Sequence, residues 1–241
     1  MIIDCISDLH GHFPELPGGD LLIVAGDLTA RDTPIEYQTF KAWLLGQNYK
    51  KKIVIAGNHD GYIEKATCES LWVMPGLEYL CDSGTEYEFE IEIEEDHKFR
   101  GTISYKVKKI LKIWGSPWTK TFPGINPKCC AFTIPFGCDD EDHISDQWNL
   151  IPEDTDILIT HCPPFGIFDS VQDFYSGNCI ETGSVSLRNK VMSLPNLKLH
   201  VFGHIHEHGG KVLDTTICKF VNASHVNENY KPVNGFVRIE L

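Results

Sequence analysis

The sequence lacks long apolar runs and has no segment typical of a secretion signal. No apolar stretch is long enough to span a bilayer, and strand-like residues begin at Met1 with no basic region and apolar core ahead of them. Cys-x-x-Cys pairs are also absent, and the nine cysteines are scattered and odd in number. These absences argue against a thiolate zinc site and favour reduced cysteines. We therefore expect a cytoplasmic protein that does not contact membranes.

Flexible linkers, internal repeats and low-complexity tracts are absent as well. With 241 residues, of which 42% are apolar, the chain is long enough to bury a sizeable core. We predict a single domain over residues 1–241. The net charge of −13 argues against binding to long nucleic acids, which require a basic surface. An acidic protein that handles an anionic substrate needs a local source of positive charge, and bound metal ions would supply it.

Short apolar runs that end in polar residues are frequent in this sequence. In the clearest of them, residues 53–55 are β-branched and apolar, and Gly57 precedes Asn58, His59 and Asp60. Glycine permits a sharp turn, and ligands of open α/β sheets bind at this end of the strands. Five apolar runs end in this way, at residues 1–6, 21–25, 53–55, 156–160 and 199–202.

Helical spacing is found between and after these runs. It predicts a helix over residues 34–46, and further helices are expected near residues 63–71 and 186–194. Strands that alternate with helices predict parallel sheets with right-handed crossovers. The last apolar segments, near residues 212–222 and 236–241, are expected to form strands of a second sheet.

The pattern changes over residues 86–113. Apolar residues alternate strictly with glutamates from Glu86 to Glu94, which is typical of a strand with one acidic face. A lysine-rich strand follows after a turn near residues 96–101, so we expect an antiparallel β-hairpin inserted in the domain. Opposite charges that face each other across the hairpin would stabilise it modestly. A substrate lid is the alternative role for this segment.

Seven side chains with oxygen or nitrogen ligands lie at the five strand ends. Hydrophobic packing does not require them there, although any single histidine could be structural. Together they favour a metal centre, and the mixture of carboxylate, imidazole and amide groups suits manganese, iron, zinc or cobalt. Because Asp8 and His10 are two residues apart, an extended segment would point both side chains the same way. The candidate ligands are Asp8, His10, Asp27, Asn58, His161, His204 and His206.

The motifs that contain these residues resemble those of the calcineurin-like metallophosphoesterases. Asp-x-His, Gly-Asp, Gly-Asn-His-Asp, a lone histidine after a strand and Gly-His-x-His follow in that family's order, at residues 8–10, 26–27, 57–60, 161 and 203–206. Within the family, the chain looks similar to the metallophosphoesterase-domain-containing proteins of animals. That branch is associated with hydrolysis of phosphodiesters, including cyclic nucleotides. The stretches that carry this closer similarity are residues 53–59, 148–152, 155–161 and 198–203.

The resemblance implies an α/β fold, namely an αββα four-layer sandwich of two mixed β-sheets flanked by helices. It also implies two divalent metal ions between the sheets, bridged by Asp27. The implied ligand sets are Asp8, His10, Asp27 and His206 for one ion and Asp27, Asn58, His161 and His204 for the other.

The reaction implied by the resemblance is hydrolysis of a small phosphodiester or phosphomonoester. A hydroxide that bridges the metals would attack the phosphorus, and His59 would assist the leaving oxygen. Asp60 would orient the ring of His59, although many relatives have glutamate at that position. Trp118, Arg188 and His225 are further candidates for the pocket lining and are equally compatible with structural roles. The hairpin at residues 86–113 looks longer than in the related branch.

Other functions are compatible with parts of this pattern. Protein Ser/Thr phosphatases usually continue the Gly-Asp motif with Asp-Arg-Gly, whereas Leu28, Thr29 and Ala30 follow here. A nuclease is disfavoured by the acidity of the chain. A non-catalytic scaffold with this fold usually lacks some ligands, and none is missing from the sequence. The sequence leaves open the natural substrate, the identity of the metals and the oligomeric state.

Overall fold

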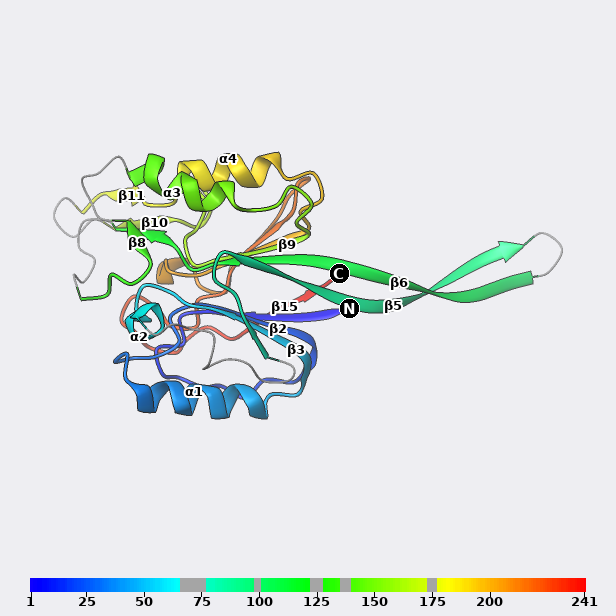
Figure 1. Cartoon of the computed structure of the whole chain (residues 1–241), viewed down its shortest axis with the longest axis horizontal. Helices are drawn as coiled ribbons and strands as arrows, with labels where there is room; N and C mark the ends of the chain where they lie inside the picture. The colour runs from blue at the N-terminus through cyan, green and yellow to red at the C-terminus, as the bar shows by residue number, and fades with distance from the viewer. Residues whose placement is uncertain (66–76, 98–100, 122–127, 135–139, 173–176) are drawn as a thin grey trace.

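A computed structural model describes most of the chain, namely residues 1–65, 77–97, 101–121, 128–134, 140–172 and 177–241. Its two large β-sheets face each other, and helices cover their outer faces (Figure 1). The predicted αββα sandwich of two mixed sheets is therefore confirmed.

The first sheet has five strands in the order β15-β1-β2-β3-β4. Neighbouring strands run parallel from β1 to β4, and β15 is antiparallel to β1. The bounds are β1 Ile2–Ile6, β2 Gly19–Ala25, β3 Tyr49–Ile55, β4 Leu77–Tyr79 and β15 Val237–Glu240.

The sheet assignment of the C-terminal strand differs from the sequence-based prediction. Residues 236–241 were expected in the second sheet, whereas β15 pairs with β1 in the first, with Ile239 opposite Ile3. Its apolar side is buried between the sheets, and Arg238 on the other side forms an ion pair with the buried Asp4 at 2.8 Å. Long-range pairing therefore decided the position of this strand, because its local pattern is compatible with either sheet.

The second sheet has six strands in the order β13-β14-β12-β9-β6-β5. The pairs β14–β12, β12–β9 and β9–β6 are parallel, whereas β13 and β5 pair antiparallel with their neighbours. The strand β5 lies at an edge. The bounds are β5 Ser83–His97, β6 Gly101–Ser116, β9 Ile157–Thr160, β12 Leu199–Phe202, β13 Val212–Asp214 and β14 Lys219–Asn222. Two small sheets pair β7 Thr119–Lys120 with β8 Thr133–Ile134, and β10 Ser170–Gln172 with β11 Cys179–Glu181.

The helix α1 covers the first sheet, and α3 and α4 cover the second (Figure 1). Thr33 and Glu36 form a capping box at the start of α1, which explains why the helix begins where the sequence predicted. The helix expected at residues 63–71 is α2 up to residue 65, and residues 66–71 lie outside the described part. The bounds are α1 Pro34–Gly46, α2 Gly61–Lys65, α3 Asp140–Asn149, α4 Val185–Ser193 and the 3₁₀ helix η2 His206–His208.

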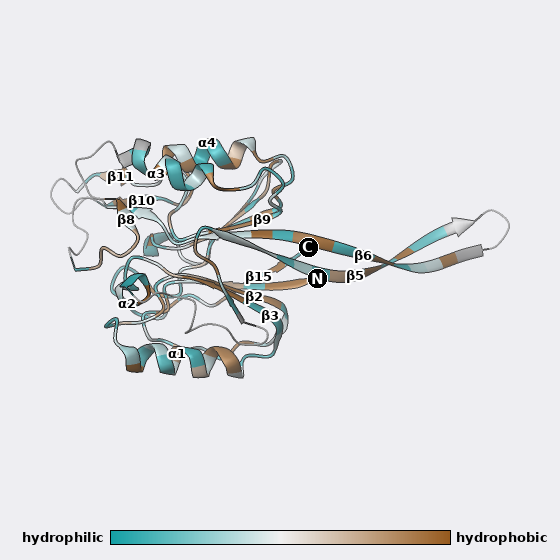
Figure 2. Ribbon diagram, viewed as in Figure 1, coloured by the Kyte–Doolittle hydropathy of each residue, from teal (hydrophilic) through white to brown (hydrophobic). Residues whose placement is uncertain are grey.

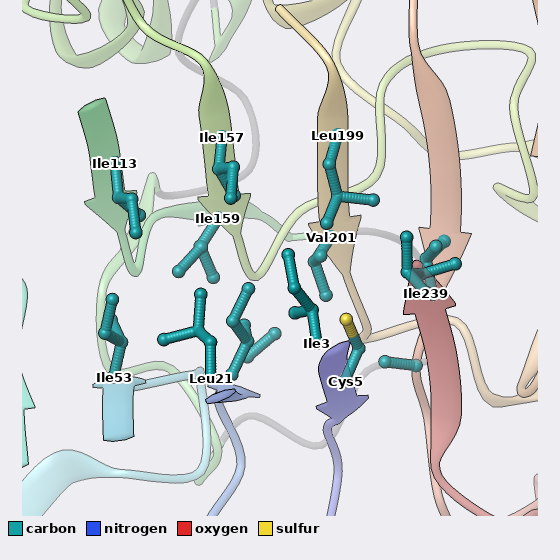
Figure 3. Close-up of a cluster of buried hydrophobic side chains, with 14 of the residues drawn as sticks. Ile3, Cys5, Leu21, Ile53, Ile113, Ile157, Ile159, Leu199, Val201 and Ile239 are labelled. Carbon is teal, nitrogen blue, oxygen red and sulfur yellow. The ribbon is translucent and has the colours of Figure 1, made fainter. Parts of the chain in front are cut away.

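A core of branched aliphatic residues joins the two sheets (Figure 3). Ile3, Leu21 and Ile53 of the first sheet face Ile157 and Leu199 of the second, and all five are fully buried. Two further clusters bury the outer faces of the sheets beneath α1 and beneath α3 and α4. The central strands are therefore covered on both sides, which explains their uninterrupted apolar sequences. This packing fixes the strand ends of both sheets relative to one another.

The hairpin of β5 and β6 extends far beyond the rest of the molecule (Figure 1). Its strands are longer than the predicted 86–113 hairpin, and hydrophobic and hydrophilic residues alternate along them (Figure 2). The base of the hairpin is part of the second sheet, because β6 pairs with β9. Tyr87, Leu111 and Ile113 at this base belong to the core between the sheets. Among the described residues, no helix is both long and apolar enough to cross a membrane.

Replacing residues 91–107 with an Asn-Gly turn should leave the fold and metal binding intact. None of the candidate ligands lies in the removed segment, and Asn-Gly suits a two-residue hairpin turn. By contrast, Leu111→Ala at the base should lower the free energy of unfolding by about 2–5 kcal/mol, because it opens a cavity in the core. Denaturant unfolding and metal analysis of both variants test this. Loss of metal from a well-folded shortened chain would contradict the expectation.

Candidate metal centre

All seven candidate ligands lie where the carboxyl ends of strands from both sheets meet. Three strands of the first sheet and two of the second contribute them. Asp8 and His10 follow β1, Asp27 follows β2, Asn58 follows β3, His161 follows β9, and His204 and His206 follow β12. Each side chain is thus held by the first residues after a buried strand, which is a rigid support for a site.

Four of the seven form a group whose ligand atoms all lie within 4.8 Å of one another: Asp8, His10, Asp27 and His206. The Nε2 atom of His206 is 3.2 Å from Oδ1 of Asp8, and Nε2 of His10 is 3.6 Å from Oδ2 of Asp27. The two histidine Nε2 atoms face each other at 3.3 Å. This is the first ligand set that the resemblance implies.

These distances fit a bound cation. Ligands about 2.1 Å from a tetrahedral metal ion lie about 3.4 Å from one another. Two facing imidazole nitrogens share at most one hydrogen bond when both rings are neutral, whereas both can donate lone pairs to one cation. These four side chains therefore match a transition-metal site better than a cluster held together by hydrogen bonds alone.

The remaining candidates gather around the side-chain oxygen of Asn58. Its Oδ1 lies 3.0 Å from Nε2 of His161 and 3.0 Å from Nδ1 of His204. The amide NH₂ of Asn58 donates to the carbonyl of Cys129 at 3.0 Å, so the oxygen is the atom that faces the histidines. His161 hydrogen-bonds the carbonyl of Ala25 through Nδ1 at 2.9 Å, which leaves Nε2 available as a ligand. This arrangement brings together two nitrogens and one oxygen from three strand ends.

Asp27 lies between the two groups. Its Oδ2 faces His10 at 3.6 Å, and its Oδ1 faces His161 at 3.4 Å. The backbone N–H of His59 donates to Oδ1 at 2.9 Å and fixes the carboxylate plane. Asp27 thus offers one oxygen to each group, as a bridging ligand would.

The backbone at the site is unusual in that several non-glycine residues have positive φ. These angles are 51° for Asp8, 42° for His10, 54° for Asp27 and 68° for His204. Such conformations are uncommon outside glycine and persist only where the surroundings enforce them. The expectation that Asp8 and His10 lie in an extended segment is therefore wrong. The chain turns sharply there, and both side chains reach the site because of this turn.

Two glycines leave room for the ligands. A Cβ atom on Gly57 would lie 2.3 Å from Oδ1 of Asp27, and one on Gly203 would lie 2.1 Å from Oδ2 of Asp8. Both distances are far below van der Waals contact. The glycines that precede Asn58 and His204 in the motifs are thus required by the close approach of carboxylates from other strands.

The electrostatics keep both carboxylates ionised. Burial alone would raise the pKa of Asp8, but the hydrogen bond from His206 and the nearby histidine charges outweigh it and hold that pKa well below its usual range. Burial likewise opposes ionisation of Asp27, and the charges of His161 and His59 lower its pKa well below the ordinary value.

The four histidine ligands differ in the direction of their pKa shifts. Burial lowers the pKa of His10 to about 4 and that of His204 to about 3, so both are neutral and can act as ligands at pH 7. Burial also opposes protonation of His161, but the charge of Asp27 outweighs it and raises its pKa to about 9. The hydrogen bond to Asp8 similarly overcomes burial at His206 and raises its pKa. Metal binding would therefore have to displace a proton from His161 at pH 7, and the raised pKa of His206 opposes metal binding in the same direction.

Asp60 is held by hydrogen bonds from two loops. Its buried carboxylate accepts hydrogen bonds from the backbone N–H groups of Gly57 at 2.8 Å and Leu28 at 3.2 Å, and from the hydroxyl of Tyr37 at 3.0 Å. Within the described residues it makes no hydrogen bond to the ring of His59. Asp60 thus joins the loops after β2 and β3. These hydrogen bonds brace the turn that carries His59, and an orienting role of Asp60 toward the ring of His59 stays a prediction.

His59 and Tyr230 complete the centre. The His59 ring is 4.6 Å from that of His10 between centroids, and its Nε2 is 3.9 Å from Oδ2 of Asp27. The ring of Tyr230 lies 4.8 Å from that of His10, 5.3 Å from that of His206 and 6.0 Å from that of His59. Tyr230 is 47% exposed, so it forms part of the rim. Sequence reasoning missed it, because it lies in a turn with no periodic pattern.

The other pocket candidates are held by structural contacts. Trp118 donates its indole N–H to Asp82 at 2.7 Å, Arg188 donates to the carbonyl of Phe165 at 2.8 Å, and His225 hydrogen-bonds the carbonyl of Asn234 through Nδ1 at 2.6 Å. Each of these contacts braces a loop. Within the described part of the chain, none of the three residues hydrogen-bonds to any of the seven ligands.

The fold and the site together define a metal-dependent phosphoesterase. The family model of the calcineurin-like phosphoesterases matches residues 1–208, and the chain belongs to that family. The chain is similar to metallophosphoesterase domain-containing protein 1 of Homo sapiens and of Mus musculus. Each is 36% identical over 244 residues, covering 98% of this chain and 70% of the relative. The resemblance read from the motifs is thus confirmed.

A solved structure shows the same fold at low sequence identity. Phosphopantetheinyl hydrolase from Mycobacterium tuberculosis superposes with a TM-score of 0.58 at 15% identity, over 98% of this chain and 95% of that one. This similarity extends over the whole sandwich. At such low identity it establishes the shared architecture and not a shared substrate.

The variant Gly203→Ala should weaken metal binding by about 10–100-fold, the usual effect of disturbing residues that support metal ligands. The added methyl group would collide with the Asp8 carboxylate and displace it. Gly235→Ala is the matched control, because nothing lies within 4 Å of a Cβ at that position. Calorimetric titration of metal into both purified variants measures the effect. Equal affinities in the two would show that the Asp8 position does not depend on the glycine.

Proposed function

We propose that the protein hydrolyses small phosphodiesters such as cyclic nucleotides, with two divalent cations as cofactors. The observation that carries this proposal is the position of Asp27, whose two oxygens face two separate groups of ligand atoms. A pair of cations bridged in this way suits an in-line displacement at phosphorus. The imidazole ligands favour manganese, iron, zinc or cobalt over magnesium.

Cations bound there would polarise the phosphoryl oxygens and make a nearby water molecule more acidic. The ligands of the chain determine the net charge of the centre. The ligands Asp8 and Asp27 carry two negative charges, and the remaining five are neutral once metal is bound, so two divalent cations would leave a positive centre. Such a centre would hold a phosphodiester anion inside a chain whose net charge is −13. The same overall acidity disfavours long nucleic acids.

His59 is the group that would assist the leaving oxygen. Its side chain is 15% exposed, on the open side of the centre, and its backbone N–H is held by Asp27. It would not be needed as a ligand, because the two proposed ligand sets would each supply four donors. A protonated imidazole here would give a proton or a hydrogen bond to an alkoxide as the ester bond breaks.

Tyr230 supports a substrate that carries an aromatic ring. It is an exposed aromatic side chain at the rim, packed edge-on against His10 and His206. Nucleobases stack on such side chains with little dependence on base identity. A nucleotide would therefore place its phosphate at the centre and its base against Tyr230, whereas the side chain of a phosphoserine or phosphothreonine carries no aromatic ring.

A substrate comparison tests the proposal. The protein is freed of metal with a chelator, reconstituted with manganese or magnesium, and assayed with a cyclic nucleotide, a nitrophenyl phosphodiester and a phosphopeptide. We expect manganese to restore more activity than magnesium, and the two diesters to be hydrolysed faster than the phosphopeptide. Faster turnover of the phosphopeptide would instead favour a protein phosphatase. No turnover by protein shown to hold metal would favour a non-catalytic scaffold.

The variant His59→Asn should distinguish the two diesters. A nitrophenolate departs without help, whereas a ribose alkoxide needs a proton, and general acid help is worth about 10²–10⁴-fold. Hydrolysis of the cyclic nucleotide should therefore fall by about that factor, with a much smaller loss on the nitrophenyl diester and unchanged metal content. The exposed His143→Asn serves as the control. Equal losses on both substrates with metal still bound would exclude a general-acid role for His59.

A further inference from the structure

Ser224 lies shortly after β14 of the second sheet, and its hydroxyl contacts a candidate metal ligand that follows the first sheet. The hydroxyl donates to Oδ2 of Asp8 at 2.7 Å, and both residues are fully buried. Ser224 belongs to neither of the two proposed ligand sets, and it lies beyond residues 1–208, which the family model matches. The hydrogen bond therefore connects the metal centre to a residue that the sequence motifs do not include.

The two carboxylate oxygens of Asp8 have different surroundings. Oδ1 faces Nε2 of His206 at 3.2 Å, whereas Oδ2 accepts the hydroxyl of Ser224. Oδ2 is also the oxygen that lies against Gly203, where a Cβ atom would be 2.1 Å away. The backbone N–H of His204 is 3.1 Å from both oxygens and so does not distinguish them. The hydroxyl of Ser224 thus directs Oδ2 away from the other ligands and leaves Oδ1 facing them.

The backbone of Ser224 is fixed on both sides. Its N–H donates to Oδ1 of Asn222 at 3.0 Å, and its carbonyl accepts from Nδ2 of Asn234 at 3.0 Å. Ser224 also forms a parallel β-bridge with Ser7, the residue that precedes Asp8. Two backbone hydrogen bonds of 2.8 Å join the segments around this bridge. The hydroxyl is therefore presented to Asp8 from a rigid support, as a precise site requires.

The side chain of Asn222 connects this support to the loop of two further ligands. It is fully buried, and its Nδ2 donates to the carbonyl of Ile205 at 2.8 Å. Ile205 lies between His204 and His206 in the sequence. One amide group therefore holds the histidine loop through its nitrogen and Ser224 through its oxygen. This arrangement fixes the position of Asp8 relative to that of His206.

A carboxylate can bind a cation through one oxygen or through both. Carboxylates that bind metal are usually hydrogen-bonded by neighbouring groups, which orient them and support metal affinity. At Asp8, the bond from Ser224 engages Oδ2 and leaves Oδ1 as the ligand atom. A ligand that uses a single oxygen keeps the coordination number low, and catalytic metal sites need such an open position for water or substrate.

We propose that Ser224 is a positioning residue that holds Asp8 as a one-oxygen ligand of the metal centre. Ser224 acts through Asp8 and does not itself bind the cation, because its hydroxyl hydrogen points to the carboxylate. The proposal rests on the metal binding that the proposed function requires. It needs only the compact group of four ligands, namely Asp8, His10, Asp27 and His206.

The variant Ser224→Ala tests the proposal in the full-length chain. Ser116→Ala is the matched control, because Ser116 is also fully buried and donates to a carboxylate at 2.7 Å, that of Asp82, which is not a candidate ligand. Manganese is titrated calorimetrically into the metal-free native chain and both variants. Ser224→Ala should bind manganese about 10–100-fold more weakly than the native chain, and Ser116→Ala should match the native affinity.

A spectrum of bound cobalt separates positioning from a general loss of stability. The visible absorption of cobalt depends on the number and geometry of its ligands, and it is recorded for the three chains at saturating cobalt. Without the hydroxyl of Ser224, Oδ2 of Asp8 is free to join Oδ1 as a ligand. The spectrum of Ser224→Ala should therefore differ from that of the native chain, whereas the spectrum of Ser116→Ala should not.

Native affinity in Ser224→Ala would overturn the proposal, as would equal weakening in Ser116→Ala or weaker binding with an unchanged cobalt spectrum. Circular dichroism establishes that each variant is folded. Should the alanine variant not fold, Ser224→Gly also removes the hydroxyl and must give the same two results. A native chain that binds manganese but hydrolyses no phosphodiester would contradict the proposed function alone. A native chain that binds no manganese would overturn both proposals.

Discussion

The structure depends on the burial of the Asp27 carboxylate among histidines. Moving an isolated carboxylate into a protein interior costs several kcal/mol, and opposite charges and hydrogen bonds must offset this cost. Here the compensation comes from His161 across the gap between the sheets, from His10 and from the backbone of His59. The carboxylate therefore couples strand ends of both sheets. The attraction between Asp27 and His161 lowers the pKa of the carboxyl group and raises that of the imidazole, so both pKa shifts have the same cause.

The apolar core determines how precisely the ligands of the polar centre are positioned. Branched residues between the sheets fix the separation of the strands, and the ligands at their ends inherit that precision. Holding the ligands in these positions requires strained backbone, seen in the positive φ angles of Asp8, Asp27 and His204. It also requires two glycines at positions where a Cβ atom would collide with a ligand carboxylate. Asp60 adds a further brace by accepting hydrogen bonds from loops after two different strands. The site is thus held rigidly by contacts that are not themselves ligands.

The hairpin of β5 and β6 differs from the sandwich in how its strands are covered. The sandwich buries every central strand on both faces, whereas the outer part of the hairpin is a two-stranded extension that carries exposed ion pairs such as Lys108 with Glu88. The alternating glutamates of β5 and the lysines of β6 keep this extension compatible with water, and charged edges oppose uncontrolled edge pairing.

The sequence by itself determined which residues end the strands and therefore which side chains gather at the centre. Runs such as residues 53–55 followed by Gly57 are local signals, since a buried strand and a sharp turn depend on adjacent residues. Tertiary structure decided the sheet that β15 joins, the partners of Asp60 and the place of Tyr230, because these depend on which distant segments meet. The strand β15 joined the first sheet because its apolar side fits beside Ile3, and Asp60 accepts a hydrogen bond from Leu28, 32 residues away in the sequence. Tyr230 reached the rim through a loop whose sequence carries no periodic signal, since only the folded chain brings it beside His10.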